Sequence, residues 1–294
     1  MKLRQHYSGQ RGFTLVEMLA ALGIFLVVTG AAFTLLTSSQ KRYQTESQVL
    51  NSFQEARLGL DQMVRDINDA GFPPPTYSSS PYSGPLNYLT SAPFAWSAGA
   101  GYPTSTCQIG TGGAGTCTTS SDSTPGDFDI IIETNPDYNP SDSTKQVQWI
   151  RYQLVGTTLM RGMAPKSSGT DPDAAFTGQS ALVPFVQNVV NNCPNPATSA
   201  IGPCPLALSN SNAFPGGNSI PIFQYTCDHP AAPQFPLPPT LACTSPSAGV
   251  DNSPVNIRDV VITLIVAAPL PDATTSQARL VQLQGRGRRF NPNQ

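Results

Sequence analysis

The feature that most constrains this chain is an uninterrupted apolar segment near its N-terminus, residues 13–36, in which Glu17 is the single charged residue. A helix of these 24 residues would be about 36 Å long, enough to cross a hydrocarbon core of about 30 Å. A carboxylate inside such a segment costs about 2.5–3.5 kcal/mol on insertion scales. We therefore expect Glu17 to have a function, and the function that its place suggests is assembly.

The residues around this segment predict its orientation. Lys2, Arg4 and Arg11 precede it, which favours a cytoplasmic N-terminus and a periplasmic or extracellular remainder. Six cysteines agree with an oxidising compartment for that remainder. The alternative is an ordinary secretory signal peptide, but its apolar core has about 7–15 residues and its cleavage site follows the core. Here the apolar segment is longer, and the candidate site at Gly12 precedes it.

The sequence RGFTLVEML at residues 11–19 resembles the type III signal of prepilins, the precursors of type IV pilins and of type II secretion pseudopilins. The resemblance implies that a membrane aspartyl peptidase, the prepilin peptidase, cuts between Gly12 and Phe13. It also implies N-methylation of Phe13. In that family the glutamate corresponding to Glu17 forms a salt bridge with the N-terminal amine of a neighbouring subunit during assembly. The residues that carry the resemblance are Gly12, Phe13, Thr14, Leu15, Glu17 and the apolar residues behind them.

The pattern after the apolar segment predicts that the helix continues to about residue 69. No proline occurs before residue 73, and Gly71 followed by three prolines supplies a stop. Many major pilins have a proline near the position of Thr34; its absence leaves Gly23 and Gly30 as weak points or as sites of close helix packing. The expected apolar face of the second half contains Leu50, Phe53, Leu60, Val64 and Ile67, and the expected polar side contains Gln54, Glu55, Asp61, Arg65 and Asp66.

The remainder of the chain predicts a β-rich head. Residues 76–126 are rich in Ser, Thr, Gly and Pro and are expected to form loops. Short turns between the expected strands favour an antiparallel sheet. The predicted class is α+β, a type IV pilin-like fold in which the long helix packs on this sheet. Strands are expected near residues 128–133, 146–154, 159–161, 185–190, 220–225, 255–267 and 279–284.

These patterns divide the chain into four expected parts. They are a leader peptide at residues 1–12, a transmembrane or filament-core helix at 13–36, an amphipathic helix at 37–71, and a periplasmic or extracellular head at 72–294. The segments 63–72, 152–161 and 222–225 are similar to those of PilW-type minor pilins and of the related J-type pseudopilins. The sequence Ala70-Gly71-Phe72 favours the PilW branch, although residues 285–289 replace the Arg-Asn ending common there.

The six cysteines form three pairs of neighbours along the chain, each pair enclosing a loop rich in Pro, Gly or Ser. The shortness of these loops favours sequential pairing, and each disulfide would contribute about 2.5–3 kcal/mol in the chain-entropy model. A metal site is not expected, because the chain has no CxxC pair and only two histidines. The expected disulfides are Cys107 with Cys117, Cys193 with Cys204, and Cys227 with Cys243.

Other functional signals are weak. No nucleophile-elbow, Walker or zinc-protease motif occurs, so we expect no enzyme activity and no cofactor. Residues 137–142 resemble the start of a calcium loop but lack its glycine, and an Asx-type turn is the simpler interpretation. Removing residues 1–12 takes three basic residues from a net charge of −2 and leaves −5. Nucleic-acid binding is therefore not expected, and Arg286, Arg288 and Arg289 are interpreted as a solvated terminus.

The resemblance implies a minor pilin of the PilW type, which primes pilus assembly from the inner membrane and ends at or near the filament tip. Its implied partners are the prepilin peptidase, other minor pilins, the major pilin, the assembly platform and a large tip adhesin. Alternatives are a J-type pseudopilin, a major pilin, which the chain's length disfavours, and a membrane-anchored protein whose head binds DNA or a host surface.

Overall fold

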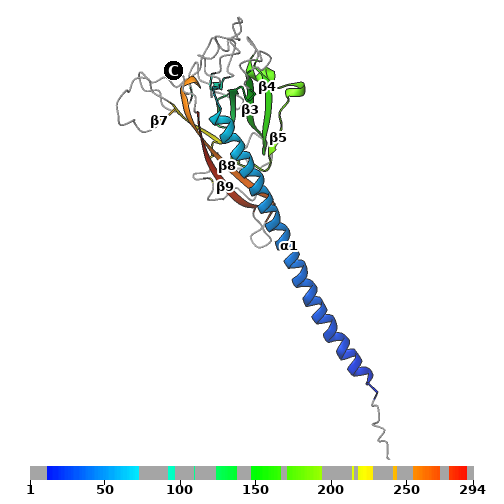
Figure 1. The fold of residues 1–294 in the computed structure, drawn as a ribbon. Helices are drawn as coiled ribbons and strands as arrows, with labels where there is room; N and C mark the ends of the chain where they lie inside the picture. Colours follow the sequence, from blue (N-terminus) through cyan, green and yellow to red (C-terminus); the bar gives the residue numbers. More distant parts are fainter. Residues whose placement is uncertain are drawn as a thin grey trace, which may run out of the picture. The chain divides into compact units, whose positions relative to one another are not determined.

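The computed structural model describes residues 12–72, 92–96, 109, 124–137, 147–166, 171–193, 214, 218–227, 241–243, 254–271 and 278–289. These residues form one long α-helix and two antiparallel β-sheets, which confirms the predicted α+β class and agrees with a type IV pilin-like fold (Figure 1). The chain divides into two compact units, one up to Ser47 and the other from Gln48 onward.

Helix α1 (Leu15–Asn68) is a single helix of 54 residues, close to the predicted bounds. Its side chains in the first unit are largely exposed, whereas the part in the second unit buries one face. The turn that follows the helix contains Gly71, whose φ of 80° is the left-handed conformation that favours glycine. The Gly71 backbone N–H donates to the carbonyl oxygen of Glu133 at 2.8 Å, so the stop also joins the helix to a strand.

The buried face of α1 agrees with the predicted one at Leu60 and Ile67 and differs from it at other positions. Ala56, Leu60, Met63 and Ile67 are buried, whereas Leu50 is exposed. The prediction missed Ala56 because alanine carries little hydrophobic signal, yet a small residue is what allows a helix to approach a sheet closely. Asp66 was expected on or near the polar side and is instead buried. Its carboxylate is tolerated there because it is hydrogen-bonded to two side chains of a sheet.

The first sheet has the order β1-β2-β3-β4-β5, and each neighbouring pair is antiparallel. Hairpin β3–β4 turns at Gly156-Thr157, and Gly156 has a φ of 61° that suits a tight turn. The β2 residues are all buried, which explains its continuous apolar run. The bounds are β1 (Phe94–Ala95), β2 (Asp129–Thr134), β3 (Gln148–Val155), β4 (Thr158–Pro165) and β5 (Val183–Val186).

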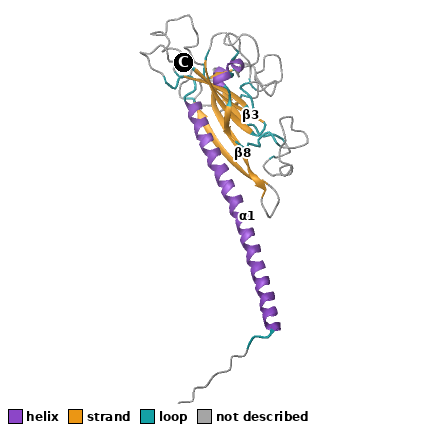
Figure 2. Ribbon diagram, turned by 90° about the vertical axis from the view of Figure 1, so that its right-hand side faces the viewer, coloured by secondary structure: helices purple, strands orange, loops and turns teal. Residues whose placement is uncertain are grey.

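The second sheet has the order β7-β6-β8-β9 and is also antiparallel. Its strand β8 is labelled in Figure 2. The predicted strands are thus divided between two sheets. Val260, Ile262 and Leu264 face the main core, while Ile265 and Ala267 belong to a smaller apolar cluster, so both faces of β8 are covered. The bounds are β6 (Phe223–Cys227), β7 (Leu241–Ala242), β8 (Ile257–Pro271) and β9 (Ala278–Arg288); short 3₁₀ turns lie at Pro172–Ala175, Gly178–Ser180 and Pro254–Asn256.

Residues 188–193, which follow β5, connect the two sheets. Residues 185–190 were predicted as one strand, but β5 ends at Val186 and Asn188 has a φ of 57°. Val189 then donates to the Thr157 carbonyl at 2.9 Å and forms a bridge with Val266 of β8. The buried Asn191 side chain accepts from the Ile265 N–H at 2.8 Å and donates to the Thr263 carbonyl at 2.8 Å. Asn191 therefore occupies the place of a paired strand beside β8.

Two glycines of β9 allow α1 to pack closely against the second sheet. A Cβ added at Gly287 would lie 2.5 Å from Ile67 Cγ2, and one added at Gly285 would lie 2.9 Å from Leu60 Cδ1. Both distances are too short for packed carbon atoms, so the glycines set the distance between helix and strand. The sequence Gly285-Arg286-Gly287 thus belongs to a paired strand and not to a solvated terminus.

Candidate functional site

The predicted processing site lies immediately before α1. Gly12 and Phe13 precede the first helical residue, Leu15, and both are exposed. Phe13 is 85 % exposed, and apart from the chain neighbours of Gly12 no described residue has a heavy atom within 4 Å of the position of a Cβ added there. The peptide bond between them is therefore accessible in the chain. That accessibility is compatible with cleavage there, which stays a prediction.

Glu17 and Thr14 form a reciprocal cap at the start of α1. The Glu17 backbone N–H donates to Thr14 Oγ1 at 3.3 Å, and the Thr14 backbone N–H donates to Glu17 Oε2 at 2.9 Å. The Thr14 hydroxyl also donates to the same carboxylate oxygen at 2.9 Å. This is a capping box, which satisfies helix N–H groups that have no partner in the first turn.

This capping role of Glu17 was not among the expectations from the sequence, although the pattern T-x-x-E before an apolar run predicts it. The cap gives Glu17 hydrogen-bond partners within its own chain. The predicted salt bridge with a second subunit would have to compete with those bonds or to share the carboxylate with them. The acid therefore has a structural partner before any assembly occurs.

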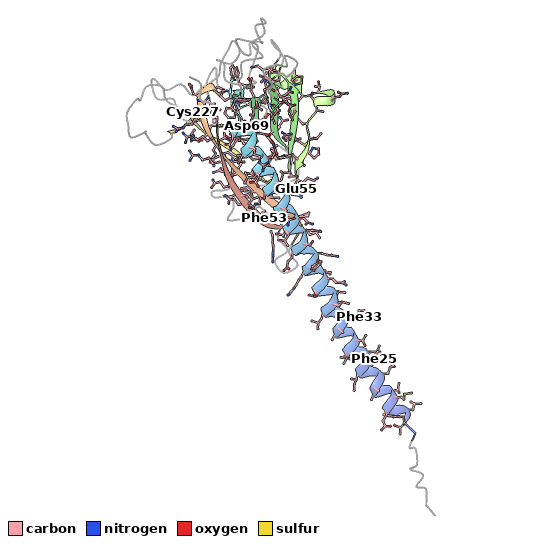
Figure 3. All side chains as sticks on the ribbon, viewed as in Figure 1. Phe25, Phe33, Phe53, Glu55, Asp69 and Cys227 are labelled. Atoms are coloured by element: carbon pink, nitrogen blue, oxygen red, sulfur yellow. A yellow bond between two sulfur atoms is a disulfide. The ribbon has the colours of Figure 1, made fainter. Side chains whose placement is uncertain are left out.

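The helix that follows is long and apolar enough to cross a membrane by length and composition, the one such helix among the described residues. Its large apolar side chains are exposed all round the helix, including Phe25 and Phe33, which are 64 % and 62 % exposed (Figure 3). An apolar helical surface of this kind requires lipid or other helices around it. Together with the leader-like residues, it supports membrane anchoring.

The second unit holds charged groups that are buried in pairs. The Tyr152 hydroxyl donates to Asp66 Oδ2 at 2.6 Å, and the Arg161 guanidinium donates to the same oxygen at 3.0 Å. These bonds join α1 to β3 and β4. Burial, reinforced by the nearby Asp66 charge, raises the pKa of Tyr152 well above its usual range, so its hydroxyl stays a donor. The triad fixes the helix on the first sheet.

A second buried pair lies at the other end of these strands. Lys166 Nζ is 2.7 Å from Glu133 Oε2, and Trp149 Nε1 donates to Glu133 Oε1 at 3.0 Å. Burial raises the pKa of the Glu133 carboxyl, and the Lys166 ammonium opposes that shift. Asp129 likewise pairs with Arg151. Each acid has a cation or donor as partner, which is the arrangement of a structural pair rather than of a reactive group.

The described residues contain no cluster of His, Cys, Asp or Glu that could hold a metal ion. The basic residues near the C-terminal end of β9 are placed differently from the prediction. Arg286 is 2.6 Å from the buried Asp259 carboxylate and Arg288 is 3.9 Å from it, while Arg289 is buried. The predicted solvation is therefore confirmed for the exposed side chains of Arg286 and Arg288, whereas the predicted terminus is wrong, because both residues belong to strand β9 and Arg289 is buried.

One of the three predicted disulfides lies wholly within the described residues. Cys227 and Cys243 are bonded, joining β6 to the residue after β7. Cys193 is also disulfide-bonded, and its partner lies outside the described residues. Cys107, Cys117 and Cys204 are likewise outside them, as are residues 138–142 of the calcium-like segment, so the other two pairings stay predictions.

Comparisons with known proteins add one finding. No curated protein and no solved structure matches the chain significantly. Residues 7–33 match the family model described as the prokaryotic N-terminal methylation motif. The matched residues include Gly12, Phe13 and Glu17 together with the first turns of α1. The match, the apolar helix and the α+β head together support a type IV pilin- or pseudopilin-like protein with a membrane anchor.

Proposed function

We propose that this chain is a minor pilin of the PilW type, which primes type IV pilus assembly and lies at or near the filament tip. The observation that carries the proposal is the N-terminal methylation motif on a helix that continues into a large β-rich head. The motif indicates a structural protein that interacts with a prepilin peptidase and with other filament subunits. The head supplies the surface by which this subunit differs from others.

Processing proceeds in three steps under this proposal. The leader holds the N-terminus in the cytoplasm while the apolar part of α1 spans the inner membrane and the head folds in the periplasm. The peptidase then cuts after Gly12 and creates a new amine at Phe13, which is methylated. The Glu17 carboxylate, held near the helix start by Thr14, becomes available to the amine of an adjacent subunit. Partner recognition offsets the cost of a carboxylate in an apolar environment.

A tip position fits the size of the head better than a position repeated along a shaft. A head that is repeated along a shaft must accommodate neighbouring subunits on every side, and the head expected at residues 72–294 is large. We therefore expect few copies per filament and contacts with other minor pilins and a tip protein.

The experiment that tests the proposal is quantitative mass spectrometry of sheared filaments, with a deletion strain beside the wild type. A few copies per filament and a strong loss of filaments on deletion are expected. Copy numbers comparable to those of the main subunit, or normal filaments without this chain, would contradict priming and a tip position. Co-purification of the head with secretion pseudopilins instead of pilins would assign the chain to a type II secretion system and not to a pilus.

A further inference from the structure

Strand β9 lies at an edge of the second sheet and pairs only with β8 among the described strands. The Arg289 N–H donates to the Arg258 carbonyl at 3.2 Å. This bond shows which residues of β9 direct their backbone groups toward β8. In an antiparallel pair the backbone groups of alternate residues face the partner strand. Gly287, Gly285, Leu283 and Val281 therefore turn their backbone N–H and C=O groups toward β8, opposite Val260, Ile262, Leu264 and Val266.

The intervening residues turn their backbone groups to the outer edge. The Arg288 N–H confirms this phase, because it donates outward to Asn68 Oδ1 of α1 at 2.9 Å. Before Arg288, no hydrogen bond from the described residues reaches the outward backbone groups of Leu280, Gln282, Gln284 and Arg286. From Leu280 to Arg286 the strand extends about 20 Å. This stretch, the β9 edge, offers unpaired donors and acceptors in the order of a strand ladder.

Other edges of the described sheets are protected in ways that β9 is not. Strands β1 and β7 have two residues each, and β5 has four with Pro184 among them. Short strands and prolines are common protections against pairing with another chain. The 11 residues of β9 contain no proline, and the ladder with β8 is regular from Asp259 to Ala267. A regular, extended edge is the kind of surface to which a partner strand adds.

The charges on β9 indicate the kind of strand that fits. The strand contains Arg279, Arg286 and Arg288 and no acidic residue. Asp259 of β8 is a single carboxylate between Arg286 and Arg288. A second copy of this chain paired through β9 would bring three further arginines to the same edge, and like charges across paired strands are destabilising. An extended segment with acidic side chains is favoured by the same charges.

We propose that the β9 edge, Leu280–Arg286, binds an extended acidic segment of another protein as an added β-strand. Main-chain hydrogen bonds to the outward groups of Leu280, Gln282 and Gln284 supply the affinity, and the arginines select for acidic side chains. This binding site goes beyond the proposed function, because strand addition requires only the folded head and would occur in a pilin and in a pseudopilin alike. Its test is correspondingly independent of filament assembly.

The first measurement is residue-resolved hydrogen exchange on the full chain in detergent micelles. Without a ligand, the amides of Leu280, Gln282 and Gln284 should exchange much faster than those of Val281, Leu283 and Gly285. A nine-residue peptide of alternating valine and glutamate should slow the first set at least tenfold and leave the second unchanged. Protection of both sets in the free chain would show that the edge is already covered and would overturn the proposal.

Matched variants then test the edge and its charge by fluorescence anisotropy with the labelled peptide. Gln282→Pro removes an outward N–H but no bond to β8, and should weaken binding at least tenfold, whereas Gln282→Thr should not. Gln284→Glu should weaken, and Gln284→Lys strengthen, binding of the glutamate peptide, independently of any effect of the proline on folding. Equal binding of a valine–lysine peptide, or concentration-dependent dimerisation that Gln282→Pro abolishes, would contradict an acidic partner strand.

Discussion

At the scale of single residues, Glu17 combines two requirements in one carboxylate. It accepts hydrogen bonds from Thr14 at the start of α1 and lies in the segment that matches the N-terminal methylation motif. The Glu17 side chain must accept hydrogen bonds at the helix start and must also offer a charge to a neighbouring subunit. A side chain that only accepts the hydrogen bonds cannot replace it. The two roles can be separated by substitution, because glutamine keeps the acceptor but loses the charge.

The first prediction concerns the cleavage site and the two roles of Glu17. Gly12→Asp should leave the precursor uncut, because the residue before the cleaved bond gains a charged side chain at the membrane face. Glu17→Gln and Glu17→Ala should both permit cleavage, but both should reduce incorporation into filaments. The measurements are N-terminal mass spectrometry and quantification of the subunit in sheared filaments. A wild-type protein that starts at Met1 would contradict the predicted processing site. Incorporation of the Glu17→Gln variant at the wild-type level would contradict the requirement for a charge at this position.

The second prediction concerns Asp127, which precedes β2 and is exposed. Its backbone carbonyl accepts from the Ile222 and Phe223 N–H groups, while partial desolvation raises the pKa of its carboxyl. Because this pKa is higher in the folded than in the unfolded chain, the group's stabilising contribution is present below the unfolded value of about 3.9 and lost as pH rises through the folded value.

Asp127→Asn removes the charged form and should therefore raise the melting temperature at neutral pH, by a small amount because solvent screens an exposed carboxylate. The gain should disappear as pH falls below about 4, where the aspartate is protonated in both states. Thermal unfolding monitored by circular dichroism across this pH range is the measurement. A gain that is independent of pH would assign the effect to packing and not to the carboxyl charge.

At the scale of secondary-structure elements, the sequence predicted more of the fold than of its packing. Helix α1 and strands β2, β3 and β8 were predicted because a long apolar run, a stop at Gly71 and regular alternation are local signals. The burial of Asp66 could not be predicted, because its partners Tyr152 and Arg161 lie far away in sequence. The division into two sheets could not be predicted either. Asn191 lies where the sheets are connected, and its side-chain hydrogen bonds to β8 produce no periodic pattern in the sequence.

The third prediction concerns the contact between α1 and β9. Gly287→Ala places a methyl group where Ile67 already lies, and overpacking of this kind costs about 1–3 kcal/mol of unfolding free energy. Ile67→Ala alone should also destabilise the head, by leaving a cavity. The double variant should be less destabilised than the sum of the two, because each change makes room for the other. Additive effects in a denaturant-unfolding cycle would show that the close approach does not determine stability.

The fourth prediction concerns the disulfides. The Cys227–Cys243 bond closes a loop with a sequence separation of 16, so the double substitution to serine should lower stability by about 3 kcal/mol in the chain-entropy model. Non-reducing peptide mapping should recover this link together with Cys107–Cys117 and Cys193–Cys204. Recovery of Cys193 linked to Cys107 or Cys117 would refute the sequential pairing but would leave the Cys227–Cys243 bond of the structure unaffected.

At the scale of the whole molecule, the chain combines an apolar helical surface that needs an apolar environment with a head that has its own buried core. The charges at residues 2, 4 and 11 come before the apolar segment, and Lys41 and Arg42 come after it. The proposed orientation therefore puts the first trypsin sites beyond the membrane on the periplasmic side. The same argument makes orientation measurable without knowledge of any partner.

The fifth prediction uses these sites. Trypsin added to intact spheroplasts should cut at Lys41 or Arg42 and release the head, while a tag placed at the N-terminus of an uncleavable Gly12→Asp variant should stay protected. Immunoblotting of membrane and soluble fractions is the measurement. Loss of the N-terminal tag together with a protected head would show the opposite orientation. Digestion of both parts, in spheroplasts whose membrane is shown to be intact, would exclude a membrane span.

The hydrogen bond between Asn68 and Arg288 joins residues separated by 220 positions. The sheet surface that receives the end of α1 includes Gly285 and Gly287, so it does not exist until the last described strand has been synthesised. Until then Leu60 and Ile67 lack their contacts with β9. Contacts so distant in sequence form slowly, and exposed apolar surface favours aggregation in the interval. Under the proposed orientation, the apolar face of α1 is therefore uncovered in the periplasm from the export of the helix until the export of β9.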